Sequence, residues 1–252
     1  MKKLNLMLKT LALLSMGIVG TESARKDDAK PATHKILMVV TNADQLGKDH
    51  KTGLWLEEFA LPYIDFFFFF HEVTVASPCG GNSPLDPQSI SDVPDAWAGA
   101  RLALTKTHKL SQVAYQQYDA IVLPGGHGPL LDLANDELLA DILRYFDGHN
   151  RIIAAVCHGP AGLVKATKAD GTPLVDGKRM TGFTDEAESL TGLDALVPFA
   201  LETKLRSLGA RFESTSPWGV YVVVDGNLIT GQNPQSSAAF AKAILEILDK
   251  RQ

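Results

Sequence analysis

The amino-acid sequence predicts an α/β protein in which helices sandwich a doubly wound, mostly parallel sheet. Short runs of aliphatic and β-branched residues without alternation recur along the chain, as expected of strands buried on both faces. Helical segments separate most of these runs, as the crossovers of a parallel sheet require. With 252 residues, 45% of them hydrophobic, the chain can build one such domain with a sizeable core.

The predicted strands share short length and β-branched or aliphatic composition. In chain order they are 35–41, 73–78, 119–126 running into a glycine turn, 151–156, and two runs within 220–231 joined at Asp225-Gly226. Helical length and composition predict helices at 52–70, 136–147, 198–208 and 236–249, and a helix that starts in GPAGLVKAT after residue 156. A weakly helical region is predicted between residue 95 and about Gln117. The segment 79–95 is rich in Gly, Pro, Ser and Asp, which is typical of a loop.

The N-terminus has the layout of a secretory signal peptide. Three lysines accompany an apolar segment at 10–20, and small residues follow at Ser23 and Ala24. A membrane anchor is the alternative, but the apolar segment has about half of the ~20 residues that a spanning helix needs. We therefore expect a signal peptide at 1–24, a polar lead-in at 25–33 and one domain at 34–252.

These boundaries predict an exported protein, periplasmic or secreted, with no membrane association after signal cleavage. The formal net charge of −5 and the absence of a basic block argue against a nucleic-acid partner. Two cysteines are too few for a disulfide scaffold or a Cys-rich zinc site. The seven histidines show no HExxH-type spacing, so no metal site is expected.

Five consecutive phenylalanines, Phe66 to Phe70, end the first predicted helix. One interpretation is a helix end that is buried on several sides. The other is an apolar patch that faces a partner, because large exposed apolar patches mark interaction sites.

The strongest chemical signal is Cys157 in the segment IIAAVCHGPAG. A buried strand is predicted to end at Val156, and a helix to begin near Pro160, where proline fits a first turn. Cys157 would then occupy a strand-to-helix elbow at the carboxyl edge of the sheet, where open α/β sheets bind ligands. The N-terminus of the following helix would stabilise a thiolate.

His158 places an imidazole beside this cysteine in sequence, although adjacent residues at a sharp turn need not touch. The alternative is a buried structural Cys157 next to a surface histidine. Cys79 lies in a Pro-Gly loop, and we expect no role for it; a Cys79–Cys157 disulfide would block the proposed nucleophile.

A second turn, LPGGHGPLLDL at 123–133, follows a strand that is predicted to neighbour the cysteine strand. Gly125 and Gly126 permit a backbone bend whose N–H groups can face a developing oxyanion. A phosphate-binding loop is the rival interpretation, but the GxxxxGK[ST] pattern is absent.

Five blocks together carry a family resemblance. KTGLWLEEFALPY, LPGGHGPLLDL, AAVCHGPAGL, TGFTDEAE and LITGQNPQSS resemble the ThiJ/PfpI superfamily over roughly residues 34–249. This resemblance implies a flavodoxin-like fold related to class I glutamine amidotransferase domains. The branch most similar to the chain is the heat-shock chaperone-like one of glutathione-independent glyoxalases.

The resemblance also implies roles for particular residues. Cys157 matches the nucleophile, and His158 matches the family's adjacent histidine. Glu188 is the best match for the acidic residue that orients the histidine, with Asp185 and Glu186 as nearby rivals.

A glutamate close to the cysteine is also implied. Glu58 matches this position, whereas Glu57 is one place out of register. The implied oxyanion donors are the backbone N–H groups of Gly126 and His158.

This resemblance predicts conversion of a 2-oxoaldehyde such as methylglyoxal into a 2-hydroxy acid such as lactate. Cys157 would form a hemithioacetal, Glu58 or His158 would move a proton from C1 to C2, and water would hydrolyse the thioester. The adjacent ketone acidifies the C1 proton, so we expect no cofactor. The expected partners are the small substrate and a second copy of the chain in a homodimer.

Other functions use the same residues. A Cys-His-acid site also serves peptidases and amidases. An exposed thiol of low pKa suits a redox sensor, and a holdase chaperone would use apolar surface such as the phenylalanine run.

Overall fold

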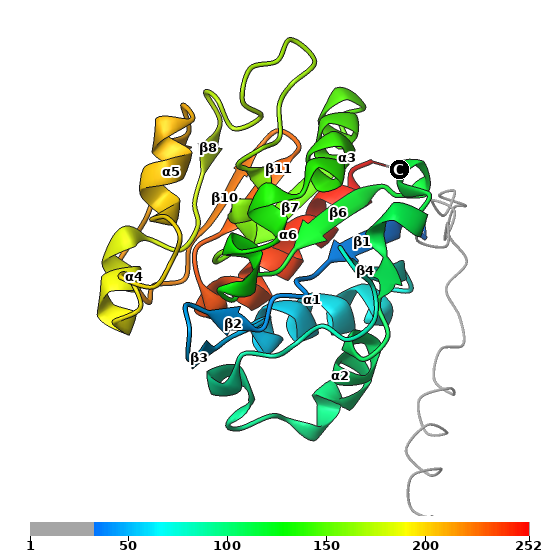
Figure 1. The fold of residues 1–252 in the computed structure, drawn as a ribbon. Helices are drawn as coiled ribbons and strands as arrows, with labels where there is room; N and C mark the ends of the chain where they lie inside the picture. Colours follow the sequence, from blue (N-terminus) through cyan, green and yellow to red (C-terminus); the bar gives the residue numbers. More distant parts are fainter. Residues whose placement is uncertain (1–32, 252) are drawn as a thin grey trace, which may run out of the picture. The chain divides into compact units, whose positions relative to one another are not determined.

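A seven-stranded sheet forms the centre of the fold in the computed structural model, which describes residues 33–251 (Figure 1). Its strand order is β10-β11-β7-β6-β1-β4-β5, and among the described strands of this sheet only the β10–β11 pair is antiparallel. The strands are β1 (Lys35–Val39), β4 (Glu72–Ser77), β5 (His108–Lys109), β6 (Ala120–Leu123), β7 (Ile152–Val156), β10 (Val222–Asp225) and β11 (Leu228–Gly231). The predicted doubly wound, mostly parallel sheet is confirmed.

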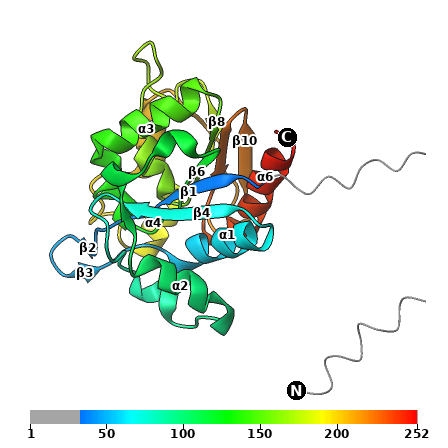
Figure 2. The same cartoon turned by 90° about the vertical axis from the view of Figure 1, so that its right-hand side faces the viewer.

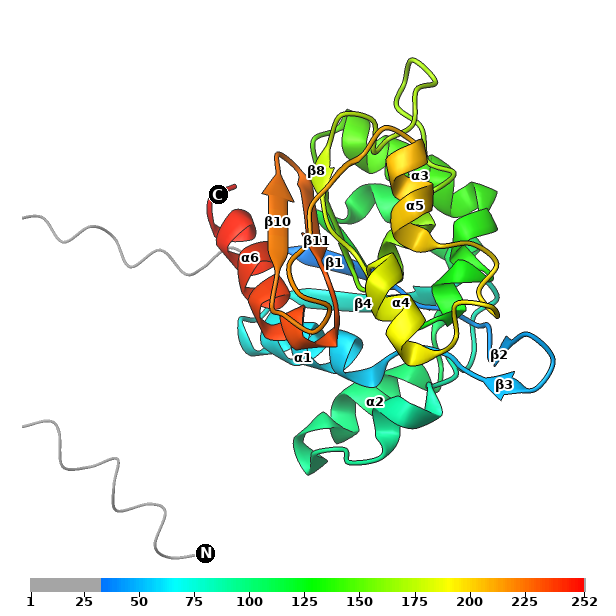
Figure 3. The same ribbon diagram turned by 90° about the vertical axis from the view of Figure 1, so that its left-hand side faces the viewer.

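Helices cover both faces of this sheet. Figure 2 shows α1 on one side of β1 and β4 and α3 on the other, and α1 packs against α6. The helices are α1 (Leu56–Phe68), α2 (Ala98–Leu104), α3 (Glu137–Gly148), α4 (Asp185–Thr191), α5 (Leu201–Ser207) and α6 (Ser237–Asp249). Two small pairs, β2 (Gln45–Leu46) with β3 (His50–Lys51) and β8 (Arg179–Met180) with β9 (Arg211–Phe212), lie outside the main sheet (Figure 3).

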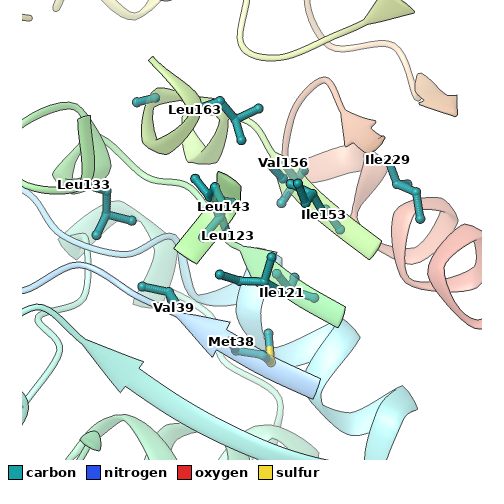
Figure 4. Packing of buried hydrophobic residues seen from close by; sticks show 14 of the residues in the cluster. Met38, Val39, Ile121, Leu123, Leu133, Leu143, Ile153, Val156, Leu163 and Ile229 are labelled. Carbon is teal, nitrogen blue, oxygen red and sulfur yellow. The ribbon is translucent and has the colours of Figure 1, made fainter. Parts of the chain in front are cut away.

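Strands β6 and β7 are buried because their sequences are apolar at every position. In β1, the residues Ile36 to Val39 are completely shielded from solvent, and β7 is buried along its whole length. Figure 4 shows these side chains meeting residues such as Leu143 from α3 and Leu163 from the segment after β7. The uninterrupted aliphatic runs are therefore explained by burial on both faces.

Parallel pairing of β1, β6 and β7 brings the carboxyl ends of these strands to one edge of the sheet. The loops after Leu123 and Val156 consequently start side by side, since Leu123 pairs with Ala155. This edge holds the residues that the sequence singled out.

Two local predictions are wrong. The segment after Cys157 forms a 3₁₀ helix, Gly159–Leu163, instead of an α-helix. A Cβ atom on Gly162 would lie 2.9 Å from Leu123 Cδ1, so close packing on the neighbouring strand governs this backbone. The first helix begins at Leu56 and not at 52, because Gly53 and Leu54 belong to an extended stretch that binds the loop at Pro84.

The buried interpretation of the phenylalanine run holds only for Phe66. Phe66 is fully buried, but the next four phenylalanines are 51–78% exposed. The helix ends at Phe68, so the run continues beyond it into solvent.

The signal peptide and the polar lead-in fall almost entirely outside the described residues, and the division of the chain at residues 24 and 33 stays a prediction. Within 33–251, no helix combines the length and apolarity required to cross a bilayer.

Candidate active site

Cys157 lies directly after β7 in a strained elbow. Its φ of 59° is in the left-handed region, which non-glycine residues seldom adopt. Two backbone hydrogen bonds hold it there: its N–H donates to the Gly231 carbonyl at 3.0 Å, and its carbonyl accepts from the Phe183 N–H at 2.8 Å. The predicted elbow is therefore present, and its side chain is 3% exposed.

His158 contacts the cysteine although the two are sequence neighbours. Its Nδ1 lies 3.4 Å from Cys157 Sγ, and its Nε2 lies 2.7 Å from Glu188 Oε2. Glu188 is buried in the first turn of α4, whereas Asp185 binds Thr203 and Glu186 is exposed. The structure thus brings Glu188, and neither of its rivals, to the imidazole.

The same carboxylate also binds His127, the histidine of LPGGHGPLLDL, for which the sequence predicted no role. His127 Nε2 lies 2.8 Å from Glu188 Oε1, and the rings of His127 and His158 are 4.3 Å apart. A histidine four residues after the end of β6, in the loop beside the cysteine strand, is the signal that could have revealed it. Glu188 therefore organises two imidazoles.

This arrangement fixes the tautomer of His158. Burial opposes ionisation of Glu188, but hydrogen bonds from His127 and His158 hold the pKa of Glu188 below its ordinary value. Burial, reinforced by His127, lowers the pKa of His158 to about 4. A neutral imidazole that donates from Nε2 to the carboxylate presents a free Nδ1 lone pair to the thiol.

Glu58 reaches the site from the first turn of α1. It is fully buried, and its Oε2 accepts a hydrogen bond from the Gly125 N–H at 2.9 Å. Burial raises the pKa of Glu58 to about 8, although hydrogen bonds to Cys157 and Gly125 oppose the rise. Glu58 is therefore a carboxylic acid at neutral pH, next to the sulfur.

The groups around Cys157 have opposing effects on the pKa of its thiol. Burial and then the negative charge of an ionised Glu58 raise the pKa of Cys157, whereas the N–H groups of Gly126 and His158 lower it. When Glu58 carries its proton, the repulsion is absent and its O–H can donate to the sulfur. These two backbone N–H groups replace the α-helix dipole that the sequence predicted, because the 3₁₀ helix here has only five residues.

Gly126 is required by this geometry. Its φ is 85°, and an added Cβ would lie 2.3 Å from the Gly53 carbonyl oxygen and 2.5 Å from the Trp55 nitrogen. The loop after β6 and the entry to α1 are thus in direct backbone contact, which presents the Gly126 N–H to Cys157.

Cys157, His127 and His158 open into a cavity of about 190 Å³. This is below the ~300–1,000 Å³ typical of pockets for drug-sized ligands, so the site suits a smaller molecule. Aromatic side chains form much of the wall, and the tilted rings of Phe183 and His158 have their centroids 4.4 Å apart. The remaining lining residues are Trp55, Asp86, Gln88, Gly126, Thr191, Leu193, Trp218, Pro234 and Gln235.

One group in the described part of the chain has the geometry of a metal site: His127, His158 and Glu188 offer ligand atoms within 4.8 Å of one another. The sequence spacing gave no sign of it. Both Nε2 atoms already lie at hydrogen-bond distance from Glu188, so the carboxylate and imidazoles are satisfied as a hydrogen-bonded relay. Cys79 is exposed and Cys157 is buried, and both are free thiols.

Known proteins resemble this chain over most of its length. It is 29% identical to the glutathione-independent glyoxalase HSP31 of Saccharomyces cerevisiae, covering 86% of this chain and 99% of that protein. The crystal structure of glyoxalase III from Candida albicans has a TM-score of 0.77 at 28% identity, covering 85% of this chain and 98% of the other.

Two further solved structures are more similar in sequence. One, whose name states no activity, is 51% identical with a TM-score of 0.86, covering 88% of this chain and all of its own. The Rapid Encystment Protein of 24 kDa from Francisella tularensis is 34% identical with a TM-score of 0.82, covering 86% and 99%. Residues 71–247 match the model of the DJ-1/PfpI family, and the chain therefore belongs to this family.

Proposed function

We propose that the protein converts 2-oxoaldehydes such as methylglyoxal into 2-hydroxy acids such as lactate, without glutathione. The observation that carries this proposal is Cys157 held between a neutral His158 and a protonated Glu58 at a small cavity. The names of the relatives in Saccharomyces cerevisiae and Candida albicans, glutathione-independent glyoxalase and glyoxalase 3, support the same chemistry.

The first step forms a carbon–sulfur bond. The thiol proton of Cys157 moves to His158 Nδ1, which lies 3.4 Å away, and the thiolate attacks the aldehyde carbon. The oxygen that becomes negative faces the N–H groups of Gly126 and His158 and takes a proton from Glu58. The product is a hemithioacetal, and Glu58 is now a carboxylate.

The second step moves hydrogen between carbons. The Glu58 carboxylate takes the C1 proton, and the His158 imidazolium protonates the ketone oxygen, which gives an enediol. Glu58 then returns its proton to C2 and takes the proton of the C1 hydroxyl, and a thioester results. We assign to His127 a hydrogen bond from the hydroxyl that forms from the ketone oxygen, because its Nε2 faces Glu188 and its Nδ1 has no hydrogen-bond partner among the described residues.

The last step is hydrolysis. His158 removes a proton from water, the water attacks the thioester carbon, and the Cys157 thiolate leaves and recovers its proton. One methylglyoxal and one water thereby yield one lactic acid, and each protein group returns to its starting state.

Proton NMR of methylglyoxal incubated with the protein in glutathione-free buffer tests this function. Lactate should form with the wild-type protein and not with Cys157→Ala. The rival function is acyl transfer by the same Cys157, His158 and Glu188, and amide substrates such as peptide p-nitroanilides report it. Release of p-nitroaniline without lactate would replace the glyoxalase assignment by a hydrolase. Oxidation of Cys157 by peroxide, with neither product formed, would indicate a sensor.

A further inference from the structure

We propose that Asp86 makes the catalytic cavity selective against anions. Its negative charge admits uncharged 2-oxoaldehydes, disfavours those that carry a carboxylate, and drives out the 2-hydroxy acid anion after hydrolysis. This inference rests on the proposed function, in whose steps Asp86 takes no part. The side chain is 3% exposed and lines the same cavity as Cys157.

The carboxylate of Asp86 is held by donors that carry no charge. Its Oδ1 accepts a hydrogen bond from the Gln88 N–H at 2.9 Å, and its Oδ2 accepts one from the Thr52 hydroxyl at 3.1 Å. A carboxylate accepts hydrogen bonds at both oxygens, and neutral donors leave its charge uncompensated. Asp86 therefore places a negative charge in the wall of the cavity.

No lysine or arginine offsets this charge among the described residues that line the cavity. His158 is neutral because burial lowers its pKa to about 4. Any proton gained by His127 is balanced by Glu188, whose carboxylate lies 2.8 Å from the Nε2 atom of that ring. Glu58 keeps its own proton at neutral pH, because burial raises its pKa to about 8. The groups around the reacting carbons thus carry a negative charge in total.

The charge of Asp86 acts on the groups that flank the thiol. Burial is the main reason why the pKa of Glu58 rises to about 8, and the charge of Asp86 adds to the rise. Burial likewise lowers the pKa of His158, and the charge of Asp86 opposes that change. In the proposed reaction, a carboxylate forms at the carbon that was bound to Cys157, next to these two groups. The same charge therefore repels it.

Backbone contacts fix the position of Asp86. Its N–H donates to the Leu54 carbonyl at 2.9 Å, and the Leu54 N–H donates to the Pro84 carbonyl at 2.8 Å. A Cβ atom on Gly53 would lie 2.4 Å from the Pro84 oxygen, so the two stretches of backbone approach closely. A carboxylate that is fixed in this way cannot turn away from a bound anion, and its repulsion persists while the product is in the cavity.

The proposed reaction gives its ligand a negative charge only in the last step. A 2-oxoaldehyde such as methylglyoxal is uncharged, whereas the 2-hydroxy acid loses its proton at neutral pH, because carboxyl groups have pKa values of about 4. A negative cavity therefore discriminates between substrate and product although the two are similar in size. Expulsion of the product keeps accumulated lactate from competing with methylglyoxal.

Binding of lactate and of lactamide, its uncharged analogue of similar shape, tests the inference without turnover. The tryptophan fluorescence of Cys157→Ala reports both ligands, because Trp55 and Trp218 line the cavity. We expect lactamide to bind at least about tenfold more tightly than lactate. Adding Asp86→Asn should strengthen lactate binding by about tenfold and change lactamide binding less than about twofold.

Two features of the variants separate charge from structure. Asparagine can still accept from the Gln88 N–H and keeps a polar group beside the Thr52 hydroxyl, so Asp86→Asn removes the charge and retains the contacts. Asp92→Asn is the matched control, because Asp92 is an exposed acidic residue of the same loop. It makes the same change in net charge and should alter the affinity for either ligand less than about twofold.

Product inhibition tests the inference in the protein that retains Cys157. Asp86→Asn should lower the inhibition constant of lactate against methylglyoxal by about tenfold. Binding to Cys157→Ala does not depend on turnover, so failure of the proposed function and failure of this inference give different results. The inference is overturned if Asp86→Asn changes the affinities for lactate and lactamide equally, as a merely structural role would, or if the inhibition constant is unchanged. Absence of lactamide binding to both proteins would overturn it as well.

Discussion

Adjacent glutamates in the first turn of α1, Glu57 and Glu58, have different environments. Glu57 is half-buried, whereas Glu58 is fully buried against Cys157 and the Gly125 N–H. The one-residue difference in register decides which carboxyl group contacts the sulfur, and it provides a matched pair for mutation.

We expect Glu58→Gln to lose lactate formation by roughly 100-fold or more, the usual scale for a group that transfers protons. Glutamine keeps the hydrogen-bonding shape but cannot move a proton. Glu57→Gln should retain nearly full activity, and circular dichroism should show both variants folded. Equal turnover by Glu58→Gln and the wild type would remove Glu58 from the mechanism.

The proton on Glu58 also predicts how stability depends on pH. The folded protein keeps this proton up to a pKa of about 8, whereas the unfolded chain releases it above about 4.5. The contribution of Glu58 to the free energy of unfolding is therefore full below about pH 4.5 and falls as the pH rises to 8. The slope is up to about 1.4 kcal/mol per pH unit.

Urea unfolding of the wild type and Glu58→Gln at several pH values measures this contribution. The difference between the two proteins isolates the contribution of Glu58, because both contain His158. The lowered pKa of His158 has the opposite pH dependence: it reduces the free energy of unfolding as the pH falls below 6.5. Parallel stability curves for the two proteins from pH 5 to 8 would mean that Glu58 is ionised in the folded state.

Glu188 should matter through both histidines that it binds. Glu188→Gln should lower kcat by roughly 100-fold, but less than Cys157→Ala, because a neutral amide no longer holds both imidazoles in their donating tautomers. His127→Ala should raise KM as well as lower kcat, since we place its Nδ1 at the hydroxyl that forms from the ketone oxygen. Glu186→Gln is the control, because Glu186 is exposed. A damaging Glu186→Gln with a silent Glu188→Gln would reverse the assignment.

At the scale of secondary structure, the loop after β6 is held by contact with the entry to α1. Gly126 and Gly171 share a φ of 85°, but only Gly126 has neighbours within reach of a Cβ atom. The two glycines thus separate the cost of the dihedral from the cost of the collision.

Gly171→Ala should lower the free energy of unfolding by about 1–2 kcal/mol, the cost of a left-handed alanine. Gly126→Ala should cost at least about 3 kcal/mol, because the dihedral and the collision with Gly53 add. It should also reduce lactate formation, since the Gly126 N–H moves away from Cys157. Guanidinium unfolding compares the two variants. Equal losses in the free energy of unfolding would show that the backbone shifts to relieve the collision at no cost in stability.

Most strands and the cysteine elbow could be predicted from the sequence because burial alone determines them. The aliphatic run before Cys157 admits little besides a buried parallel strand. The 3₁₀ helix after it could not be predicted, since Pro160 suits either kind of first turn and packing of Gly162 on Leu123 decides. The helix α4 left a signal that was not used: Thr184 accepts from the Ala187 N–H as its N-cap, and acidic residues follow.

The residues of the candidate site differ in how far the sequence alone predicted them. Cys157 follows from the elbow itself, which left the contact of His158 with the sulfur open. The roles of His158, Glu188 and Glu58 came from the family resemblance, because their approach to the cysteine depends on tertiary packing. His127 was missed for the same reason, since nothing local shows that Glu188 lies between two rings. The sequence also left open whether Phe67 to Phe70 are buried or exposed, because composition does not tell which side of a helix end is covered.

At the scale of the whole molecule, export remains a proposal that depends on the sequence of the first 24 residues. Protein purified from the periplasm or medium of its host should begin between about Gly20 and Arg25 by N-terminal sequencing. Cytoplasmic protein that retains Met1 would contradict it. The homodimer also stays a prediction, which sedimentation velocity addresses directly.

The central claim is that one cysteine converts a 2-oxoaldehyde into a 2-hydroxy acid without glutathione. Loss of methylglyoxal alone does not test it, because lysine and arginine side chains also consume aldehydes. The direct measurement is the amount of lactate formed per methylglyoxal consumed, with the wild type and with Cys157→Ala in glutathione-free buffer. We predict one lactate per methylglyoxal over many turnovers for the wild type and none above background for Cys157→Ala. Consumption without lactate, or equal lactate from both proteins, would contradict the account.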